Sequence, residues 1–209
     1  MVHKHLSTKV FKREKYTMKL LHFLGLILFL STFGFGNQID LEKLQNSFSL
    51  LNIDEKIEPN GKLYKVLQEN SYNKLKRYHE VKEIHKELLE QLDNSNIPPF
   101  FSYIPFHESG FNPKIKTKTV AGLWQLSAQT AKNFGLNVSK KNDERLDSHK
   151  STEAIIKILK HYYKKYKKWY LADFAYGMGE GTLERLIKRN GSDRFSVLFL
   201  DPKFPKGTK

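Results

Sequence analysis

Residues 97–113 read IPPFFSYIPFHESGFNP, and the expected fold follows from this stretch. A pair of prolines suits the first turn of a helix, and a glycine and a proline shortly after Glu108 stop it. We therefore expect a short helix over about 99–108 that ends at Glu108. Partial burial among the neighbouring aromatic side chains would raise the pKa of this carboxyl, which suits a general acid near neutral pH. A glutamate that only caps the helix or forms an ion pair is the alternative.

The rest of the sequence is also helical in pattern. Upstream, apolar residues recur at three- and four-residue spacing, which predicts amphipathic helices. Downstream, Ser127 and Gly135 bracket a two-turn helix as its N-cap and C′ residues, and no strand-rich block is visible. We predict an all-α, mainly helical fold. The expected helices are 40–51, two within 63–92, 99–108, 128–134, one capped by Ser151 or Thr152, 171–176 and 181–189.

Residues 1–36 have the pattern of a secretory signal peptide. Basic residues precede the apolar run LLHFLGLILFLSTFGFG at 20–36, and two glycines at its end fit the small positions of a cleavage site. We predict cleavage before Asn37, with translation starting at Met18 as a further hypothesis. An uncleaved N-terminal anchor is the alternative, although the run is short for a spanning helix. In both cases the chain is expected in the periplasm or cell envelope.

The composition excludes several kinds of chemistry. Lys and Arg total 36 against 22 Asp and Glu, for a formal net charge of +14, and there is no Cys. Disulfides, thiolate metal sites and thiol nucleophiles are therefore excluded. The His107-Glu108 pair lacks the second histidine of a zinc hydrolase motif, because Phe111 occupies its place. We predict no metal and no organic cofactor, and export makes nucleic acid an unexpected partner for this basic chain.

Four motifs follow one another along the second half of the chain. They are IPFHESGFNP at 104–113, AGLWQL at 121–126, NDER at 142–145 and AYGMGEG at 175–181. In this order and at this spacing they resemble the soluble lytic murein transglycosylase (SLT) domain family of peptidoglycan-cleaving enzymes, and most of all its membrane-bound type D branch.

The resemblance implies a division of the chain into regions. A lysozyme-like, all-α catalytic domain is expected at 97–191, with an N-terminal helical extension at 37–96 before it. The remaining residues, 192–209, are expected to form a C-terminal tail.

The resemblance also implies the chemistry. Glu108 matches the family's catalytic glutamate, which acts alone as acid and base. It cleaves the β-1,4 bond between N-acetylmuramic acid (MurNAc) and N-acetylglucosamine (GlcNAc), and a 1,6-anhydro-MurNAc product forms without water. Ser109, Gln125 and Tyr176 match residues that are expected to bind substrate. For Ser109 a helix cap is the alternative, and Trp124 is expected either to stack on a sugar or to lie in the core.

The sequence departs from the family pattern at Gly177, where the family has an asparagine. Loss of this amide is expected to weaken substrate binding by about 1–3 kcal/mol if its partner stays buried. Two alternatives stay open, of which the first follows from Gly177 and the second from the shared fold. One is a catalytically weak peptidoglycan-binding or scaffold protein. The other is a lysozyme-like muramidase, in which Asp143 or Glu180 would activate a water.

The expected partner is the peptidoglycan glycan strand, and the chain is expected to act as a monomer. Association with the membrane, either peripheral or through the N-terminus, is a further hypothesis. A lysine-rich stretch either forms a solvated helix face or attracts the carboxylates of the cell wall. Its lysines are Lys157, Lys160, Lys164, Lys165, Lys167 and Lys168.

Overall fold

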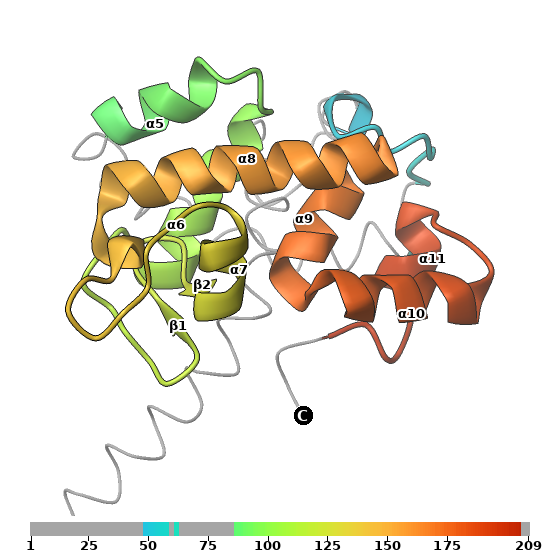
Figure 1. Ribbon diagram of the computed structural model, residues 1–209. Coiled ribbons are helices and arrows are strands. Elements are labelled where there is room, and N and C mark those ends of the chain that lie inside the picture. The colour runs from blue at the N-terminus through green and yellow to red at the C-terminus, as the bar shows by residue number, and fades with distance from the viewer. Residues whose placement is uncertain (1–47, 59–60, 63–85, 206–209) are drawn as a thin grey trace, which may run out of the picture.

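The computed structural model describes residues 48–58, 61–62 and 86–205 (Figure 1). The predicted signal peptide, most of the helix expected at 40–51 and most of the region at 63–92 lie outside the described residues. Within the described part the molecule is mainly helical, as predicted, with one pair of two-residue strands. No helix of that part combines the length and the apolar character needed to cross a membrane.

One long helix and several short ones make up the described fold. Helix α8 (Ser148–Tyr166) crosses the molecule in Figure 1, and α9 (Trp169–Met178) and α10 (Glu180–Asn190) follow it in the chain. The remaining elements are α5 (Lys86–Asp93), the 3-10 helix η2 (Pro99–Tyr103), α6 (Ile104–Ser109), β1 (Val120–Ala121), β2 (Leu126–Ser127), α7 (Ala128–Asn133), the 3-10 helix η3 (Glu144–Leu146) and α11 (Phe195–Phe199).

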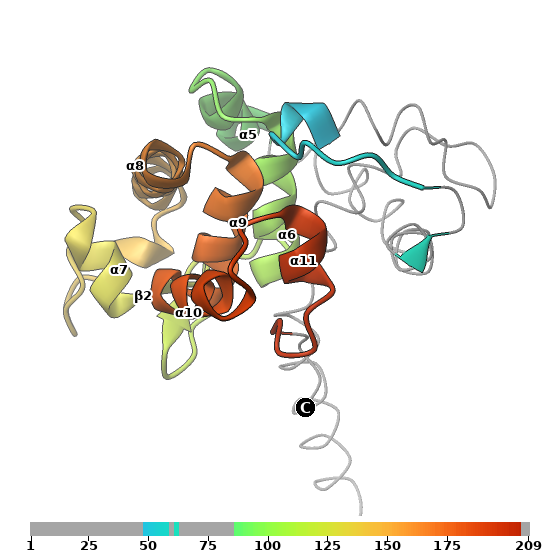
Figure 2. The ribbon, with the colours of Figure 1, turned by 90° about the vertical axis from the view of Figure 1, so that its right-hand side faces the viewer.

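Helices α8 and α9 form the centre of the core. The apolar side chains of α8 lie three, four and seven positions apart, so they share one face, and this face packs against α5 and α9. Every residue of α9 from Tyr170 to Ala175 is buried, because α8 and α10 both pack against this helix. Figure 2 shows α9 in the middle of the helices. The buried side chains of α8 include Ile155, Ile158, Leu159 and Tyr162.

The prediction for the start of α8 was wrong. The N-cap is Asp147, whose carboxylate accepts a hydrogen bond of 3.0 Å from the Lys150 amide. Ser151 and Thr152, the predicted caps, lie inside the helix, and both hydroxyls donate to the carbonyl oxygen of Ser148. An aspartate is as good a cap as a serine, so the helix begins at Asp147, before both predicted caps.

Other predicted boundaries are confirmed. The Ser127 hydroxyl accepts a hydrogen bond of 3.0 Å from the Thr130 amide and begins α7, and Gly191 ends α10 with a φ of 60°. The helix expected at 99–108 is present, although its first part is the 3-10 helix η2 and the α-helical part begins at Ile104.

Helix α11 was not predicted, since it lies in the region expected to be a tail. Phe195 is fully buried, and its ring centroid lies 5.3 Å from that of Phe48 and 5.6 Å from that of Tyr170. Aromatic contacts of this kind stabilise a core beyond the area they bury. Residues 195–199 are therefore part of the packed structure, and the domain boundary at 191 stays a prediction.

Replacing the buried ring tests the contribution of α11. Phe195→Ala should lower the free energy of unfolding by about 3–5 kcal/mol, because it leaves a cavity among aromatic side chains. Urea unfolding followed by circular dichroism measures this. Leu50→Ala is the control, since Leu50 is 58% exposed, and it should change the free energy by under about 0.5 kcal/mol. Equal effects of the two substitutions would mean that α11 is not packed as described.

Candidate active site

Glu108 lies in the last turn of α6 and is buried, with 8% of its surface exposed. The helix can end directly after it because Gly110 takes the left-handed conformation, with a φ of 58°. The Gly110 amide closes the last turn by donating to the carbonyl oxygen of Phe106. A carboxyl in this position is held on a rigid helix end and is largely shielded from water, which is the environment expected of a general acid.

A tight hairpin turn at 122–125 connects β1 and β2, which pair antiparallel with Ala121 opposite Leu126. Gly122 has a φ of +83°, and a Cβ atom placed there would lie 1.6 Å from the carbonyl oxygen of Arg145. Only glycine fits this position. At the other end of the turn, Gln125 has a φ of 47°, and a residue other than glycine in this region carries backbone strain that often marks a functional site.

Three of the predicted site residues meet at this turn. The Ser109 hydroxyl donates to the Leu123 carbonyl oxygen at 2.7 Å, and the Tyr176 hydroxyl donates to the carbonyl oxygen of Trp124. The Gln125 side-chain amide donates to the carbonyl oxygen of Gly122 at 2.6 Å. The three side chains therefore satisfy successive carbonyl groups of one turn, and they come from α6, α9 and the turn itself.

These hydrogen bonds bear on the roles predicted for the residues. The Ser109 hydroxyl also donates to the Pro105 carbonyl oxygen within α6, at 3.0 Å, so both of its contacts are to backbone. The oxygen of the Gln125 side chain is buried and has no hydrogen-bond partner among the described residues. A buried acceptor without a partner calls for an explanation, and a ligand that contacts the turn is one such explanation. The substrate-binding roles of these residues stay predictions.

Trp124 lies in the core. Its side chain is fully buried, and its indole nitrogen donates to the Thr152 hydroxyl at 2.9 Å. Of the two roles considered for this residue, the structure therefore supports packing rather than stacking on a sugar. The contact ties the hairpin turn to the first turns of α8.

Arg145 connects the second strand of the hairpin to Asp143. Its guanidinium binds both carboxylate oxygens of Asp143 at 2.8 Å and donates to the carbonyl oxygen of Leu126 at 3.1 Å. The hydrogen bonds that Asp143 accepts from Arg145 and Lys116 hold the pKa of its carboxyl well below the usual range. The Asp143 carboxylate is thus already engaged by two cations. The other carboxylate considered as a base, that of Glu180, binds Lys165 at 2.7 Å.

The electrostatics of the site centre on Tyr176. Burial raises the pKa of its hydroxyl well above the usual value, and the negative charges of Glu108 and Asp173 raise it further. The hydroxyl therefore stays protonated and remains a hydrogen-bond donor at any physiological pH. The same interaction places the carboxyl of Glu108 within electrostatic reach of the tyrosine.

Asp173 is a buried acid that the sequence reasoning missed. It is 1% exposed, and neither carboxylate oxygen has a hydrogen-bond partner among the described residues. Burial raises the pKa of Asp173 to about 8, so the carboxyl is mostly neutral at pH 7. It lies three residues before Tyr176 on α9, on the same side of the helix. The signal was present in the sequence, as one acidic residue inside the apolar run at 169–178.

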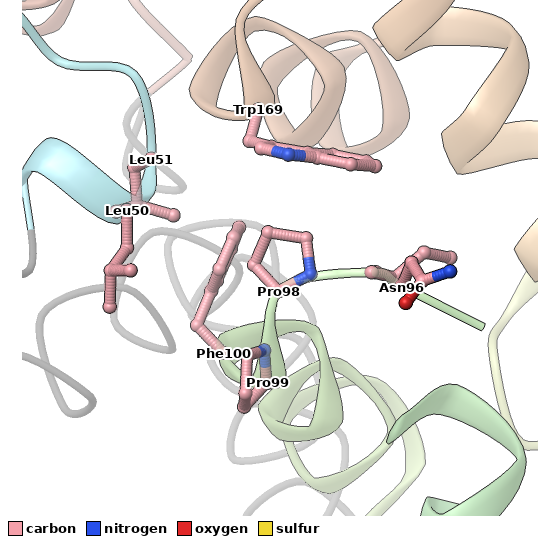
Figure 3. Close-up of a pocket in the computed structure, with 8 residues that line it drawn as sticks. Leu50, Leu51, Asn96, Pro98, Pro99, Phe100 and Trp169 are labelled. Carbon is pink, nitrogen blue, oxygen red and sulfur yellow. The ribbon is translucent and has the colours of Figure 1, made fainter. Parts of the chain in front are cut away.

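A separate pocket lies near the start of η2. It has a volume of about 270 Å³, and Figure 3 shows the Trp169 ring above Pro98, with Asn96 on one side and Leu50 and Leu51 on the other. None of the predicted site residues lines it, so it is distinct from the candidate active site. Its lining residues are Leu50, Leu51, Asn96, Ile97, Pro98, Pro99, Phe100 and Trp169.

The described residues form no cluster of metal-binding side chains. Among the residues that the structure describes, no three His, Asp or Glu side chains come together in a way that could hold a metal ion. The candidate site thus consists of carboxyl, hydroxyl and amide groups around the hairpin turn.

Comparison with known proteins agrees with the family resemblance of the sequence motifs. The family model described as "Transglycosylase SLT domain" matches residues 89–199. The membrane-bound lytic murein transglycosylases D of Escherichia coli strains K12 and O6:H1 are each 31% identical over 121 residues, which are 57% of this chain and 27% of the relative. A protein of Alteromonas sp. (strain M-1) named for tributyltin chloride resistance is 32% identical over 102 residues, covering 48% of this chain and 49% of the relative. The chain thus spans about a quarter of the length of the Escherichia coli relatives.

The close approach at Gly122 predicts a large effect of a single methyl group. Gly122→Ala should lower the free energy of unfolding by more than about 3 kcal/mol, because the Cβ would overlap the Arg145 carbonyl. Gly135→Ala is a matched control, since Gly135 has a φ of +93° and open space around its Cβ position. It should cost only the left-handed backbone strain of about 1–2 kcal/mol. Similar losses in urea unfolding would contradict the packing described at the turn.

Asp173 predicts a dependence of stability on pH. Its pKa is raised from 3.8 to about 8 in the folded protein, so the folded state binds more protons than the unfolded state between these values. Stability from this group is therefore fully present below about pH 4, falls by up to about 1.4 kcal/mol per pH unit as the pH rises, and levels off above about pH 8.

Asp173→Asn should remove this contribution. Urea unfolding of wild type and variant at several pH values between about 5 and 9 measures the difference. The wild type should lose stability relative to the variant as the pH rises. Parallel curves would show that the carboxyl of Asp173 is solvated or paired in the folded protein.

Proposed function

Because the chain belongs to the transglycosylase SLT domain family, whose model matches more than half of it, we propose that it is a lytic transglycosylase that cleaves peptidoglycan glycan strands. The observation that carries the proposal is the position of Glu108. It is a buried carboxyl at a rigid helix end, next to a turn that two other predicted site residues hold from α6 and α9.

In the proposed reaction Glu108 serves first as acid and then as base. Its proton passes to the glycosidic oxygen between MurNAc and GlcNAc as the bond from C1 of MurNAc to that oxygen breaks. The resulting carboxylate then takes the proton from the C6 hydroxyl of the same MurNAc. The oxygen of this hydroxyl bonds to C1 and closes a 1,6-anhydro ring. Glu108 ends protonated as it began, and no water is consumed.

The neighbouring residues support this cycle by holding the site. Ser109 and Tyr176 fix the hairpin turn against α6 and α9, and fixed geometry lowers the cost of reaching the transition state. The free oxygen of the Gln125 amide can accept a hydrogen bond from a hydroxyl or an acetamido N–H of the glycan. The protonated hydroxyl of Tyr176 adds no charge to the site, so it does not oppose the change of charge on Glu108 during the cycle.

The alternative of a hydrolytic muramidase has less support. It needs a second carboxylate to activate water. Asp143 and Glu180 are the candidates, and both are engaged in ion pairs with lysine or arginine side chains. The alternative of a weak binding or scaffold protein rests on Gly177, which lacks the amide found in the family. A weak binding protein would release much less product than an active enzyme, so a measurement of activity distinguishes the two.

The proposed location follows from the substrate. Peptidoglycan lies outside the cytoplasmic membrane, and the Escherichia coli relatives are named as membrane-bound. We place the protein in the periplasm or cell envelope, with the apolar run at 20–36 as the export signal or anchor. It acts there as a monomer, without metal or organic cofactor.

Removing the acid tests the proposal. Glu108→Gln should lower the rate at which purified sacculi release anhydromuropeptides by at least about 10²- to 10⁴-fold, because a glutamine cannot donate or take up the proton. Mass spectrometry of the soluble products measures the rate. Glu153→Gln is the control, because this exposed glutamate of α8 makes none of the described hydrogen bonds at the hairpin turn, and it should leave the rate unchanged. Full release by Glu108→Gln would remove Glu108 from the mechanism, and no release by wild type would favour the scaffold protein.

A further inference from the structure

Helix α8 carries an exposed face with three lysines that have no acidic partner among the described residues. Lys157, Lys160 and Lys164 are all exposed, and none forms an ion pair within the described part of the chain. They lie three, four and seven positions apart, so they share one side of the helix over about 10 Å. We call these three residues the free lysine face.

Three of the four other lysines at this helix are neutralised within the protein, whereas Lys167, the exposed C-cap residue, has no ion pair among the described residues. Lys150 binds Glu144 at 2.6 Å, Lys165 binds Glu180 and Glu184, and Lys168 binds Asp193 at 2.8 Å. The lysine-rich stretch of the sequence is therefore divided by the structure. The charges of Lys165 and Lys168 are used within the fold, whereas those of the free lysine face are directed to solvent.

One acidic residue accompanies the free lysine face. Glu153 is exposed and lies four residues before Lys157, but no ion pair joins the two side chains in the described structure. Beyond Glu153 the face carries only positive charge as far as Lys164. The charge pattern therefore favours an anionic partner along this side of α8.

The apolar residues of α8 favour a hydrophilic partner over a lipid bilayer. Helices that bind membrane surfaces insert apolar side chains next to their basic residues. In α8 the large apolar side chains pack into the core, and the exposed large hydrophobic residue of the described chain is Leu50, which lies outside α8. The free lysine face thus offers charge without side chains to insert, which suits a water-swollen polymer that carries carboxylates.

We propose that the free lysine face binds the carboxylates of the peptide stems of peptidoglycan and holds the protein on the cell wall. This inference rests on the proposed function, since it takes the same polymer as partner, but it assigns a second contact that does not include the hairpin turn. Binding at this face raises the local concentration of glycan around Glu108 without changing the chemical step.

Two matched variants of the full-length protein test the proposal. The first, K157Q/K160Q/K164Q, removes the free lysine face, and the second, K150Q/K165Q/K168Q, removes three ion-paired lysines and changes the net charge equally. In co-sedimentation with purified sacculi at about 0.1 M salt, the first should raise the apparent Kd roughly tenfold, and the second by under about threefold. Binding of the wild type should weaken as salt is raised, and the first variant should show a smaller dependence.

Sacculi whose carboxylates have been converted to amides identify the partner group. Wild type should bind them about as weakly as the first variant binds ordinary sacculi. Equal losses in the two variants, or undiminished binding of wild type to amidated sacculi, would overturn the proposal. A difference between the variants on vesicles that contain phosphatidylglycerol, but not on sacculi, would also overturn it and assign the face to the membrane.

The same samples separate this proposal from the proposed function. Release of anhydromuropeptides by wild type is recorded in each binding experiment. Lysine-dependent binding without release would contradict the enzymatic activity and leave the surface assignment standing. Release with identical binding of all three proteins would support the activity and contradict the surface assignment.

Discussion

The candidate site depends on one close contact, the packing of the Gly122 backbone against the carbonyl group of Arg145. Because Gly122 has no side chain, the hairpin turn can lie directly on Arg145, and the guanidinium of this arginine binds the next strand. The turn then presents successive carbonyl oxygens to Ser109 and Tyr176. Helices α6 and α9 are tied together through this turn, and Glu108 is held in place because it precedes Ser109 in α6.

This frame also sets the electrostatics around Glu108. The residues that surround the turn are buried, so charges interact more strongly there than in water. Tyr176 keeps its proton, and Asp173 is mostly neutral at pH 7 because it is buried without a partner. Asp143, in contrast, is ionised and held by Arg145 and Lys116. Asp143 is thus engaged in ion pairs that hold the fold, whereas Glu108 is the buried carboxyl that we propose exchanges a proton with the substrate.

Local signals in the sequence predicted local structure well. The Ser127 cap and the Gly191 end were predicted correctly, because each depends on residues within one turn of the helix. The predicted start of α8 was wrong because Asp147, which was not considered as a cap, precedes Ser151 and Thr152 and begins the helix. The fold class and the family followed from the ordered motifs, but those motifs could not reveal that Ser109 and Tyr176 bind backbone. Asp173 was missed although the apolar run around it indicated burial, and α11 was missed because its burial depends on segments distant in sequence, such as Phe48 against Phe195.

We propose that the glycosidic bond is broken without water, through Glu108 alone. Digestion of purified sacculi by the full-length protein in water enriched in oxygen-18 tests this most directly, with mass spectrometry of the released muropeptides. We expect anhydro products with no heavy oxygen at the MurNAc end. Products that carry one heavy oxygen at a reducing MurNAc end would show hydrolysis by an activated water and would contradict it.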